Sequence, residues 1–422
     1  MKKAIYSCRY MPVLLCFAML SAQVFAQDSL HISINASDHL FLEKNLLAVA
    51  GQLNVDAQKA LEIQASLYPN PTVSFGVNAY DADNRKLLYA GANGEKTAEI
   101  EQLILLGGKR KNEIALAKQN SKQAALEFSD LLRNLKYTLH TNMYSLYFDL
   151  KTLQKFNTQL QQLDTIIDAY ETQAKKGNLP LKEVVRLKST FIQLNNNKTT
   201  LLQSIQDEQK TLQVLLNVNE FIVPDVDEQV WQQFDRLPVV DSLLQLALAN
   251  RADIQLAAVN KDIAALNVKY QKSLAVPDLT LNTSYDQRGA AFNNQFLFTV
   301  GIPLPLWNRN QGNIRYAETQ TKLASVNEQL QQNSLTAEVN AAWYNMQRSI
   351  QEFQKTQAVY NKDFTDVYEG MRENFLKQNI SIVEFVDFFE SYSESLAEVN
   401  RIRKQLALSA ENINYTTAYT LY

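Results

Sequence analysis

Residues 102–114, QLILLGGKRKNEI, lead from an apolar segment through a Gly-Gly pair into a charged run without Gly or Pro. A shift of 200 residues aligns this stretch with residues 302–314, IPLPLWNRNQGNI, and the alignment continues to residue 165 with ten identities. The two halves also share the order of the segments that interrupt their helices and strands. YPNP (68–71) matches AVPD (275–278), and KGNLPLKEV (176–184) matches KQNISIVEF (377–385). The sequence therefore predicts a tandem duplication, carried more by this shared order than by identity.

Long helices are predicted by two runs that contain neither Gly nor Pro. The run between Lys109 and Lys176 has apolar residues at alternating spacings of three and four, which is typical of a left-handed coiled-coil seam. The seam comprises Leu132, Leu135, Leu139, Asn142, Leu146, Asp149, Leu153, Phe156, Leu160, Leu163, Ile167 and Tyr170. Residues 181–223 form the second run, and Gly177 and Pro180 favour a tight turn between the two. Each repeat is therefore expected to hold a long antiparallel helical hairpin, and a further helix is expected ahead of the strands in each repeat.

Four segments instead alternate with period two or carry β-branched and aromatic residues. They are TVSFGVNAY (72–80), TAEIEQLIL (97–105), LTLNTSYD (279–286) and QFLFTVGI (295–302). A polar loop joins each pair, so two β-hairpins are expected, too few strands for a stable sheet alone. Aromatic residues near these strands favour either an interfacial belt or ordinary strand packing. They are Phe75, Tyr80, Tyr285, Phe296 and Phe298.

The first 26 residues have the layout of a secretory signal peptide, with a basic start, an apolar core and small residues before the cut. The expected divisions are a signal peptide (1–26), a first repeat (27–216), a connector (217–240) and a second repeat (241–422). The apolar core at 11–20 is well short of the roughly 18 residues of a membrane anchor. Leu15 before Cys16 disfavours a lipidated N-terminus. Both cysteines leave with the signal, so the mature chain is expected to have no disulfide or thiol chemistry.

Composition argues against nucleic-acid binding and catalysis. The 41 basic residues nearly balance the 44 acidic ones, so no strongly basic surface is expected. The three histidines, His31, His39 and His140, lack metal-site spacing, and no cofactor is indicated. Gly107-Gly108 before Lys109 has the composition of a phosphate cradle without P-loop spacing, and we interpret it as a hinge from strand to helix. We expect a protein that is not an enzyme.

Together these features resemble the TolC family of outer-membrane efflux proteins, especially its heavy-metal-efflux branch. The similarity covers essentially the whole mature chain and includes YPNPTVSFG and EQLILLGGKR, stretches that enter and leave the barrel in this family. The resemblance implies a mainly α fold with a β-barrel portion. In it, a homotrimer forms a twelve-stranded barrel in the outer-membrane lipid, with four strands from each chain. Long coiled-coil helices would continue the barrel as a tunnel across the periplasm.

The resemblance implies the function of a passive exit duct in a tripartite efflux pump. An inner-membrane transporter would supply energy, and a periplasmic adaptor would mediate docking. A type I protein-secretion duct is the alternative within this fold. A periplasmic coiled-coil adaptor or structural protein is disfavoured, because adaptors usually carry one hairpin within Gly-rich β domains, whereas this chain has two hairpins and 11 glycines. Nothing in the sequence indicates metal coordination, and the substrate is left open.

Residues 379–395, NISIVEFVDFFESYSES, contain the two acids that the resemblance assigns to the periplasmic aperture, Glu384 and Asp387. Three copies would give two stacked rings of carboxylates that attract cations. The alternative is that acids in a first helical turn only stabilise the helix dipole. Heptad spacing separates two faces: Phe385, Phe389, Tyr392, Leu396 and Val399 on one, and Glu384, Asp387, Ser391, Glu394 and Glu398 on the other.

The first repeat offers Glu183 as a possible gate contact. The resemblance matches it to an acid that joins the closed-state contacts of the family. Its usual tyrosine and arginine partners correspond to Phe375 and Ile380 in this chain. We therefore consider Lys182, Arg186 and Lys377 as alternative partners of Glu183.

Overall fold

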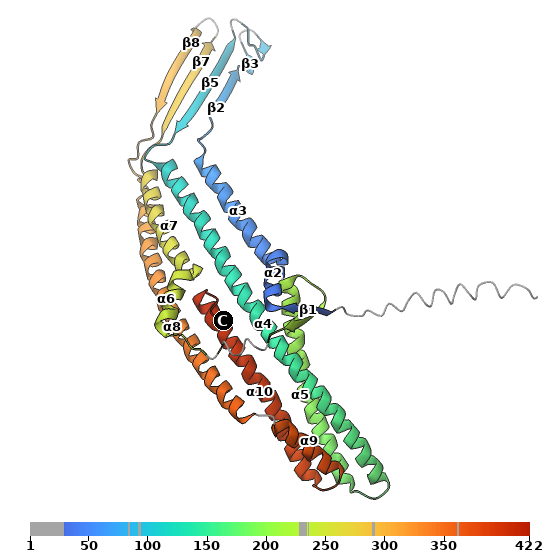
Figure 1. Ribbon diagram of the computed structural model, residues 1–422. Coiled ribbons are helices and arrows are strands. Elements are labelled where there is room, and N and C mark those ends of the chain that lie inside the picture. Colours follow the sequence, from blue (N-terminus) through green and yellow to red (C-terminus); the bar gives the residue numbers. More distant parts are fainter. Residues whose placement is uncertain are drawn as a thin grey trace, which may run out of the picture. The chain divides into compact units, whose positions relative to one another are not determined.

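The computed structural model describes residues 29–82, 85–91, 94–227, 234, 236–288, 292–360 and 363–422, so the expected signal peptide lies outside the described residues. Figure 1 shows the helices and strands. In chain order they are β1 (Ser29–Ser33), α2 (Ile34–Lys44), α3 (Leu46–Ser66), β2 (Thr72–Val77), β3 (Tyr80–Asp81), β4 (Lys86–Leu87), β5 (Glu95–Ile104), α4 (Lys109–Lys175), α5 (Leu181–Leu216), β6 (Phe221–Asp225), α6 (Val240–Asn250), α7 (Ala252–Leu274), β7 (Leu279–Arg288), β8 (Phe292–Gly301), α8 (Gln311–Val359), α9 (Asp363–Leu376) and α10 (Ile382–Thr417).

Contacts divide the chain into two compact units. Unit 1 draws on Met1–Lys44, Asn142–Glu228 and Lys362–Arg401, and unit 2 on Asn45–Thr141, Gln229–Asn361 and Ile402–Tyr422. Each unit takes segments from both predicted repeats, so neither coincides with a repeat. Among the helices in the described part of the chain, none combines the length and apolar composition that a membrane span requires.

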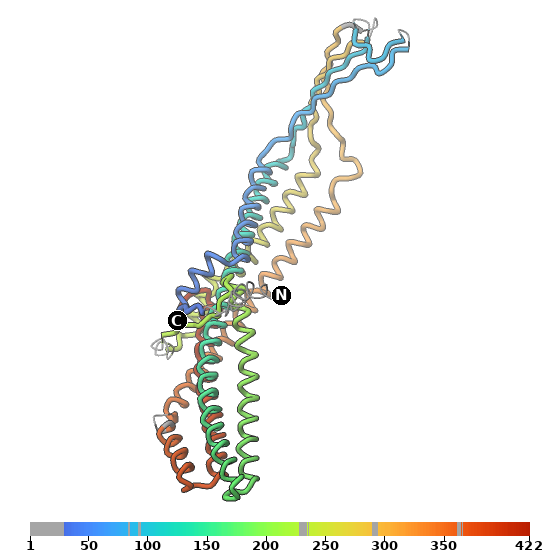
Figure 2. Tube along the Cα trace, turned by 90° about the vertical axis from the view of Figure 1, so that its right-hand side faces the viewer, coloured from blue at the N-terminus to red at the C-terminus, as the bar shows by residue number. Residues whose placement is uncertain are grey.

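The predicted helical hairpin of the first repeat is confirmed by α4 and α5. Helix α4 has 67 residues, and its seam residues Leu139, Leu146 and Leu163 have no exposed surface. Figure 2 shows α4 and α5 side by side, as a coiled-coil seam requires. Helix α5 ends where Asn217 adopts a left-handed conformation (φ 50°).

The four predicted strands form one antiparallel sheet in unit 2, in the order β2-β5-β7-β8. The inner ladder pairs β5 with β7 from Glu95↔Arg288 to Ile104↔Leu279, and so joins the two hairpins. Strands β2 and β8 are the two edges of this sheet. The register explains the predicted alternation, because partners across a sheet point to the same face.

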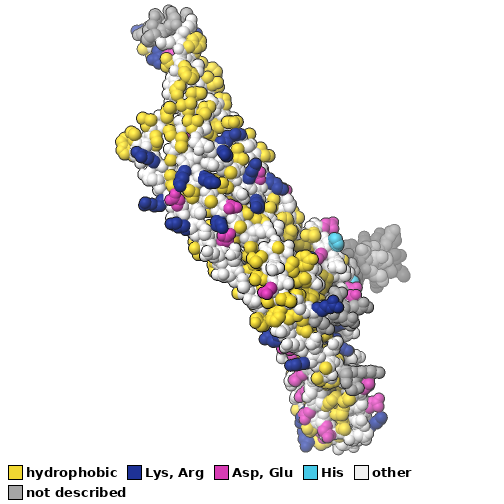
Figure 3. Space-filling view, turned by 60° about the vertical axis from the view of Figure 1, so that its left-hand side comes forward, with side chains coloured by type: hydrophobic (Ala, Val, Ile, Leu, Met, Phe, Trp, Pro, Cys, Tyr) yellow, Lys and Arg dark blue, Asp and Glu magenta, His cyan; other side chains and the backbone are white. Residues whose placement is uncertain are grey.

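The two faces of the sheet differ sharply in polarity. What we call the apolar face contains two cross-strand rows, Val73-Ile100-Thr283-Phe298 and Phe75-Ala98-Tyr285-Phe296. The opposite polar face contains Thr72-Glu101-Asn282-Thr299 and Ser74-Glu99-Ser284-Leu297. Phe75 is 83% exposed and Phe298 66%, so none of the described helices covers the apolar face at these rings. Figure 3 shows hydrophobic side chains gathered over the strands.

The Gly-Gly pair is confirmed as the hinge from β5 to α4. Gly107 and Gly108 have φ +68° and +75°, and a Cβ on Gly107 would lie 2.7 Å from the Val276 Cβ. Asp278 Oδ1 accepts from the Leu106 backbone N–H (3.0 Å) and lies 2.6 Å from Lys109 Nζ. This carboxylate therefore ties the hinge of the first repeat to the segment that precedes β7.

Three features depart from the sequence prediction. A parallel ladder pairs β1 with β6, so a strand lies in the expected connector. Gln209 of α5 supports this ladder, because its side-chain amide donates to the Ile222 carbonyl (2.6 Å) and accepts from the Ile222 N–H (2.9 Å).

The other two departures are interruptions of helices. The long helix expected after β8 ends at Val359, and α9 begins at Asp363. The helix expected before β7 is interrupted at Arg251, whose backbone is extended (φ −71°, ψ 121°).

Candidate functional site

The turns of the two helical hairpins lie in unit 1 and have the same backbone geometry. In the first, the N–H of Gly177 bonds to the carbonyl three residues earlier and that of Asn178 to the carbonyl five residues earlier, both at 3.0 Å. Gln378 and Asn379 repeat this pattern at 3.0 and 2.9 Å. Both Gly177 (φ +79°) and Gln378 (φ +61°) are left-handed, as such helix ends require. The second turn thus delivers Glu384 and Asp387 to the first two turns of α10.

Glu384 is bound to the start of its own helix. Its Oε2 accepts from the backbone N–H and from the hydroxyl of Ser381, both at 2.8 Å, while the Glu384 N–H donates to Ser381 Oγ (3.3 Å). This is a capping box. The backbone hydrogen bond first, and the hydroxyl second, lower the pKa of Glu384 below its ordinary value. Within this chain, therefore, the contacts of Glu384 are those of a helix-capping residue, which was the alternative that the sequence left open. Its carboxylate is exposed and ionised.

Asp387 forms a link between the two hairpins. Arg186 Nη2 of α5 lies 3.0 Å from Asp387 Oδ1, and the two side chains are 42% and 64% exposed. One turn further along, Thr190 Oγ1 donates to Glu390 Oε1 at 3.0 Å. An exposed ion pair contributes only about 0–1 kcal/mol to stability. Its larger effect is to balance the charge of Asp387.

Glu183 lies half-buried beside Tyr170 and has none of the expected cationic partners. Burial first, and the negative charge of Glu183 second, raise the pKa of Tyr170 to about 12. Arg186 pairs with Asp387 instead, and Lys377 with Glu373 at 3.4 Å. In the described part of the chain no ion pair joins Glu183 to either cation or to Lys182, so these alternative pairings are wrong. The competing acids Asp387 and Glu373 lie closer to the two cations.

An aromatic core fixes the helices behind these acids. Phe375 stacks on Phe385 with ring centroids 4.1 Å apart, and Tyr170 stacks on Phe375 at 5.2 Å. Tyr368 and Tyr392 stack at 4.3 Å in the same core. The two predicted faces of α10 are confirmed. The packing face is buried or nearly so, whereas Glu384, Asp387, Ser391, Glu394 and Glu398 are exposed.

The chemistry available at this site is electrostatic. A groove of about 690 Å³ beside the turns is lined by residues of both hairpins, among them Glu183 and Arg186 of the first and Ser381 of the second. Across the described residues, no group of three or more His, Cys, Asp or Glu side chains is gathered as a metal site would require. Sequence reasoning missed Arg186 as the partner of Asp387. The available signal was that the two occupy equivalent positions of the repeats, 201 residues apart, with opposite charge.

Comparison with known proteins gives a sequence family and a curated relative. Residues 243–413 match the family model for "Outer membrane efflux protein". The cobalt-zinc-cadmium resistance protein CzcC of Cupriavidus metallidurans is 25% identical over 284 residues, which cover 66% of this chain. The aligned stretch spans 64% of the length of that relative.

Solved structures with the same fold cover nearly the whole chain. CusC is similar with a TM-score of 0.74 and 16% identity, over 91% of this chain and 92% of CusC. The CmeC outer membrane channel of Campylobacter jejuni gives 0.74 and 13%, over 92% of this chain and 86% of CmeC. VceC of Vibrio cholerae gives 0.71 and 15%, over 92% and 97%. The expected TolC-like fold is confirmed.

Proposed function

We propose that this chain, whose residues 243–413 match the outer membrane efflux protein model, forms the outer-membrane exit duct of a tripartite efflux pump. Three copies make the channel, a periplasmic adaptor docks on it, and an inner-membrane transporter supplies the energy. The duct itself conducts passively, since the residues at its site can attract or repel ions by their charge but supply no energy. The relative CzcC is named for cobalt, zinc and cadmium resistance, which favours divalent metal ions of that kind as the substrate.

The observation that carries this proposal is the two-faced sheet of unit 2. Its apolar face suits contact with lipid, and its polar face, with Glu99 and Glu101, suits a water-filled lumen. The edge strands β2 and β8 have no further partner among the described strands. Sheet edges are not tolerated in lipid, so each edge pairs with a neighbouring copy, and three copies close twelve strands into a barrel.

The helices support the periplasmic part of the proposal. At about 1.5 Å per residue, the 67 residues of α4 span about 100 Å. Such a helix is far longer than ordinary domain packing needs, and its buried seam indicates that it lies in a coiled coil for much of its length. The length and the seam both suit the wall of a tunnel that crosses the periplasm.

We expect the protein purified from outer membranes in detergent to be a trimer that opens pores in planar bilayers. We also expect loss of its gene to sensitise cells to cobalt, zinc or cadmium. Cross-linking, single-channel recording and growth assays measure these properties. A soluble periplasmic monomer contradicts the duct. A trimer that forms pores, in cells whose metal tolerance is unchanged, contradicts only the substrate.

We propose that Glu384 and Asp387 contribute unequally to the charge of the periplasmic aperture. Glu384 contributes three uncompensated carboxylates to the trimer, and Arg186 balances those of Asp387. Glu384→Gln keeps the capping hydrogen bonds, because Gln also serves in a capping box, but removes the charge. We expect it to lower the cation-to-anion permeability ratio by up to roughly tenfold, and Arg186→Gln to raise it.

Reversal potentials in salt gradients measure this ratio. Glu352→Gln, at an exposed acid of α8, is the matched control and should leave it unchanged. Equal ratios in all three variants would return Glu384 and Asp387 to purely structural roles. Among the described residues Glu183 has no cationic partner to release, so we propose that the Arg186–Asp387 pair is the gate contact in its place.

A further inference from the structure

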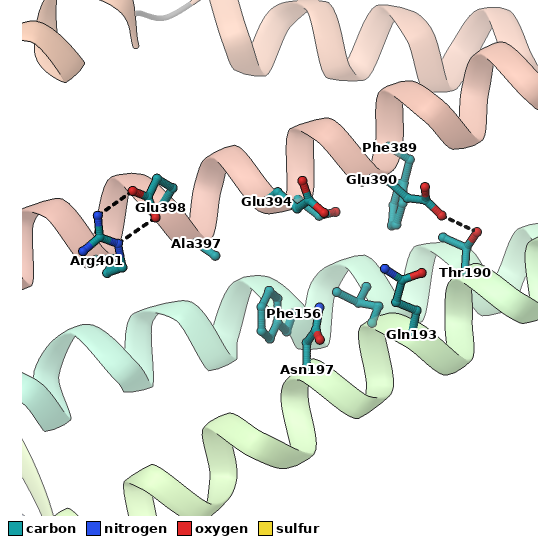
Figure 4. Close-up of a pocket in the computed structure, with 12 residues that line it drawn as sticks. Phe156, Thr190, Gln193, Asn197, Phe389, Glu390, Glu394, Ala397, Glu398 and Arg401 are labelled. Carbon is teal, nitrogen blue, oxygen red and sulfur yellow. Dashed lines mark hydrogen bonds and ion pairs between the residues drawn. The ribbon is translucent and has the colours of Figure 1, made fainter.

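A groove of about 240 Å³ lies between α5 and α10 in unit 1, away from the hairpin turns (Figure 4). Its floor is apolar and includes Phe156, Leu194, Phe389 and Ala397. Its α10 side carries three carboxylates at every fourth residue, Glu390, Glu394 and Glu398. Its α5 side offers only neutral polar groups from Thr190, Gln193 and Asn197. The groove is therefore apolar below and acidic along one rim.

Two of the three carboxylates have no balancing cation. Arg401 binds Glu398 through two hydrogen bonds of 2.7 and 2.6 Å, so that charge is balanced. Glu390 accepts only from the neutral Thr190 hydroxyl, as the dashed line in Figure 4 marks. Within the described residues, no cation lies within ion-pair distance of Glu390 or Glu394. The rim thus presents two neighbouring negative charges to a ligand.

Ser393 supplies an independent sign of a ligand. The residue is 6% exposed and lines the groove. Its hydroxyl has no hydrogen-bond partner among the described residues. Buried hydroxyls in folded proteins nearly always have a partner, because water is no longer available to them. A donor bound in the groove between Glu390 and Glu394 would provide one.

The spacing of these groups selects the class of ligand. Residues four apart on a helix are separated by about 6 Å along its axis. That distance is close to the separation of the two ammonium groups in an extended diaminopropane or diaminobutane unit. The intervening methylene groups would lie on the apolar floor, as the stems of lysine side chains do on protein surfaces. A single metal ion fits less well, because no metal-type cluster is gathered among the described residues.

We propose that this groove binds linear aliphatic polyamines. One ammonium group lies at Glu390 and the next at Glu394, and an N–H group donates to Ser393 Oγ. The methylene chain covers Phe389 and Leu194. Binding needs only the fold of unit 1, so it does not depend on conduction by the assembled duct.

Isothermal titration of the full-length protein in detergent at low ionic strength tests this proposal, with spermidine as the probe. We expect saturable binding that Glu394→Gln weakens by about tenfold or more, because a charge-assisted hydrogen bond is lost. Ser393→Ala should weaken it less, and the control Glu352→Gln not at all. Diaminobutane should bind more tightly than butylamine, which carries one charge.

Three results would overturn the proposal. The first is equal affinity for butylamine and diaminobutane, which would indicate a site for a single organic cation. The second is displacement of spermidine by equimolar magnesium, which would indicate a divalent-ion site. The third is unchanged spermidine affinity in Glu394→Gln when circular dichroism shows the variant to be folded, which would place any binding elsewhere.

Discussion

Replacing Arg251 with methionine is expected to lower the free energy of unfolding by about 2–3 kcal/mol, because Asp253 and Glu338 lose their charge-assisted hydrogen bonds to a buried cation. The Arg251 side chain is 3% exposed at the interruption between α6 and α7. It donates to both oxygens of Asp253 (2.9 and 2.6 Å), to Glu338 (2.6 Å) and to the Thr416 carbonyl (3.4 Å). One side chain thereby joins α7, α8 and α10 within unit 2.

Denaturant unfolding in detergent measures this loss. The control Lys272→Met removes an exposed pair with Glu318 (3.0 Å, 57% and 48% exposed), and its effect should stay within about 0.5 kcal/mol. Equal effects of the two substitutions would show that Arg251 does not organise the unit.

The same cluster gives a pH dependence with a definite sign. Burial raises the pKa of Asp253, but hydrogen bonding and the positive charge of Arg251 outweigh it, so the pKa lies below its ordinary value. A lowered carboxylate pKa stabilises the fold above the pKa of the unfolded chain, and this contribution is lost as pH falls through the folded value. The stability difference between the native protein and Arg251→Met should therefore narrow as the pH falls below about 4.

Replacing Phe298 with lysine is expected to cost about 2–4 kcal/mol and to deplete the proposed trimer from the outer membrane, because in that trimer it puts a charge on the lipid face of the barrel. Phe298 lies in a central row of the apolar face. Thr299→Lys is a closely matched control, since the next residue points to the polar face and pairs with Asn282 beside Glu101. That lysine would face water and an acid.

Trimer content of the outer-membrane fraction, read as heat-modifiable bands on gels, measures both variants. The proposal requires a large loss for Phe298→Lys and near-native levels for Thr299→Lys. The reverse order would mean that the polar face meets lipid. Equal levels would mean that neither face does.

Much of this fold could be predicted from the sequence because its signals are local. A heptad seam that continues for tens of residues predicts α4, since each turn repeats the same apolar contact. Alternation over six to ten residues predicts the strands of the large sheet, and the Gly-Gly pair predicts the hinge. The two faces of α10 could be separated for the same reason, because helical spacing alone assigns Phe385 and Glu384 to different sides.

The missed features depend on residues that are distant in sequence. The β1–β6 ladder joins five-residue strands almost 200 positions apart, and strands that short have no distinctive periodicity. The partners of Arg251 come from three helices, so no spacing in the sequence marks it as a buried cation. The Arg186–Asp387 pair joins residues 201 positions apart on different helices, so no local spacing marks it as a contact.

The β5–β7 ladder has a meaning for the origin of the assembly. Inside one chain it joins the last strand of the first hairpin to the first strand of the second. In a closed ring of three chains, β8 of one copy and β2 of the next make the corresponding join, again from a last strand to a first. At all six junctions between hairpins, the last strand of one hairpin then pairs with the first strand of the next, as it would in a ring of six ancestral chains with one hairpin each. Gene duplication would have turned three of the six subunit boundaries into covalent connections and left the wall of the pore unaltered.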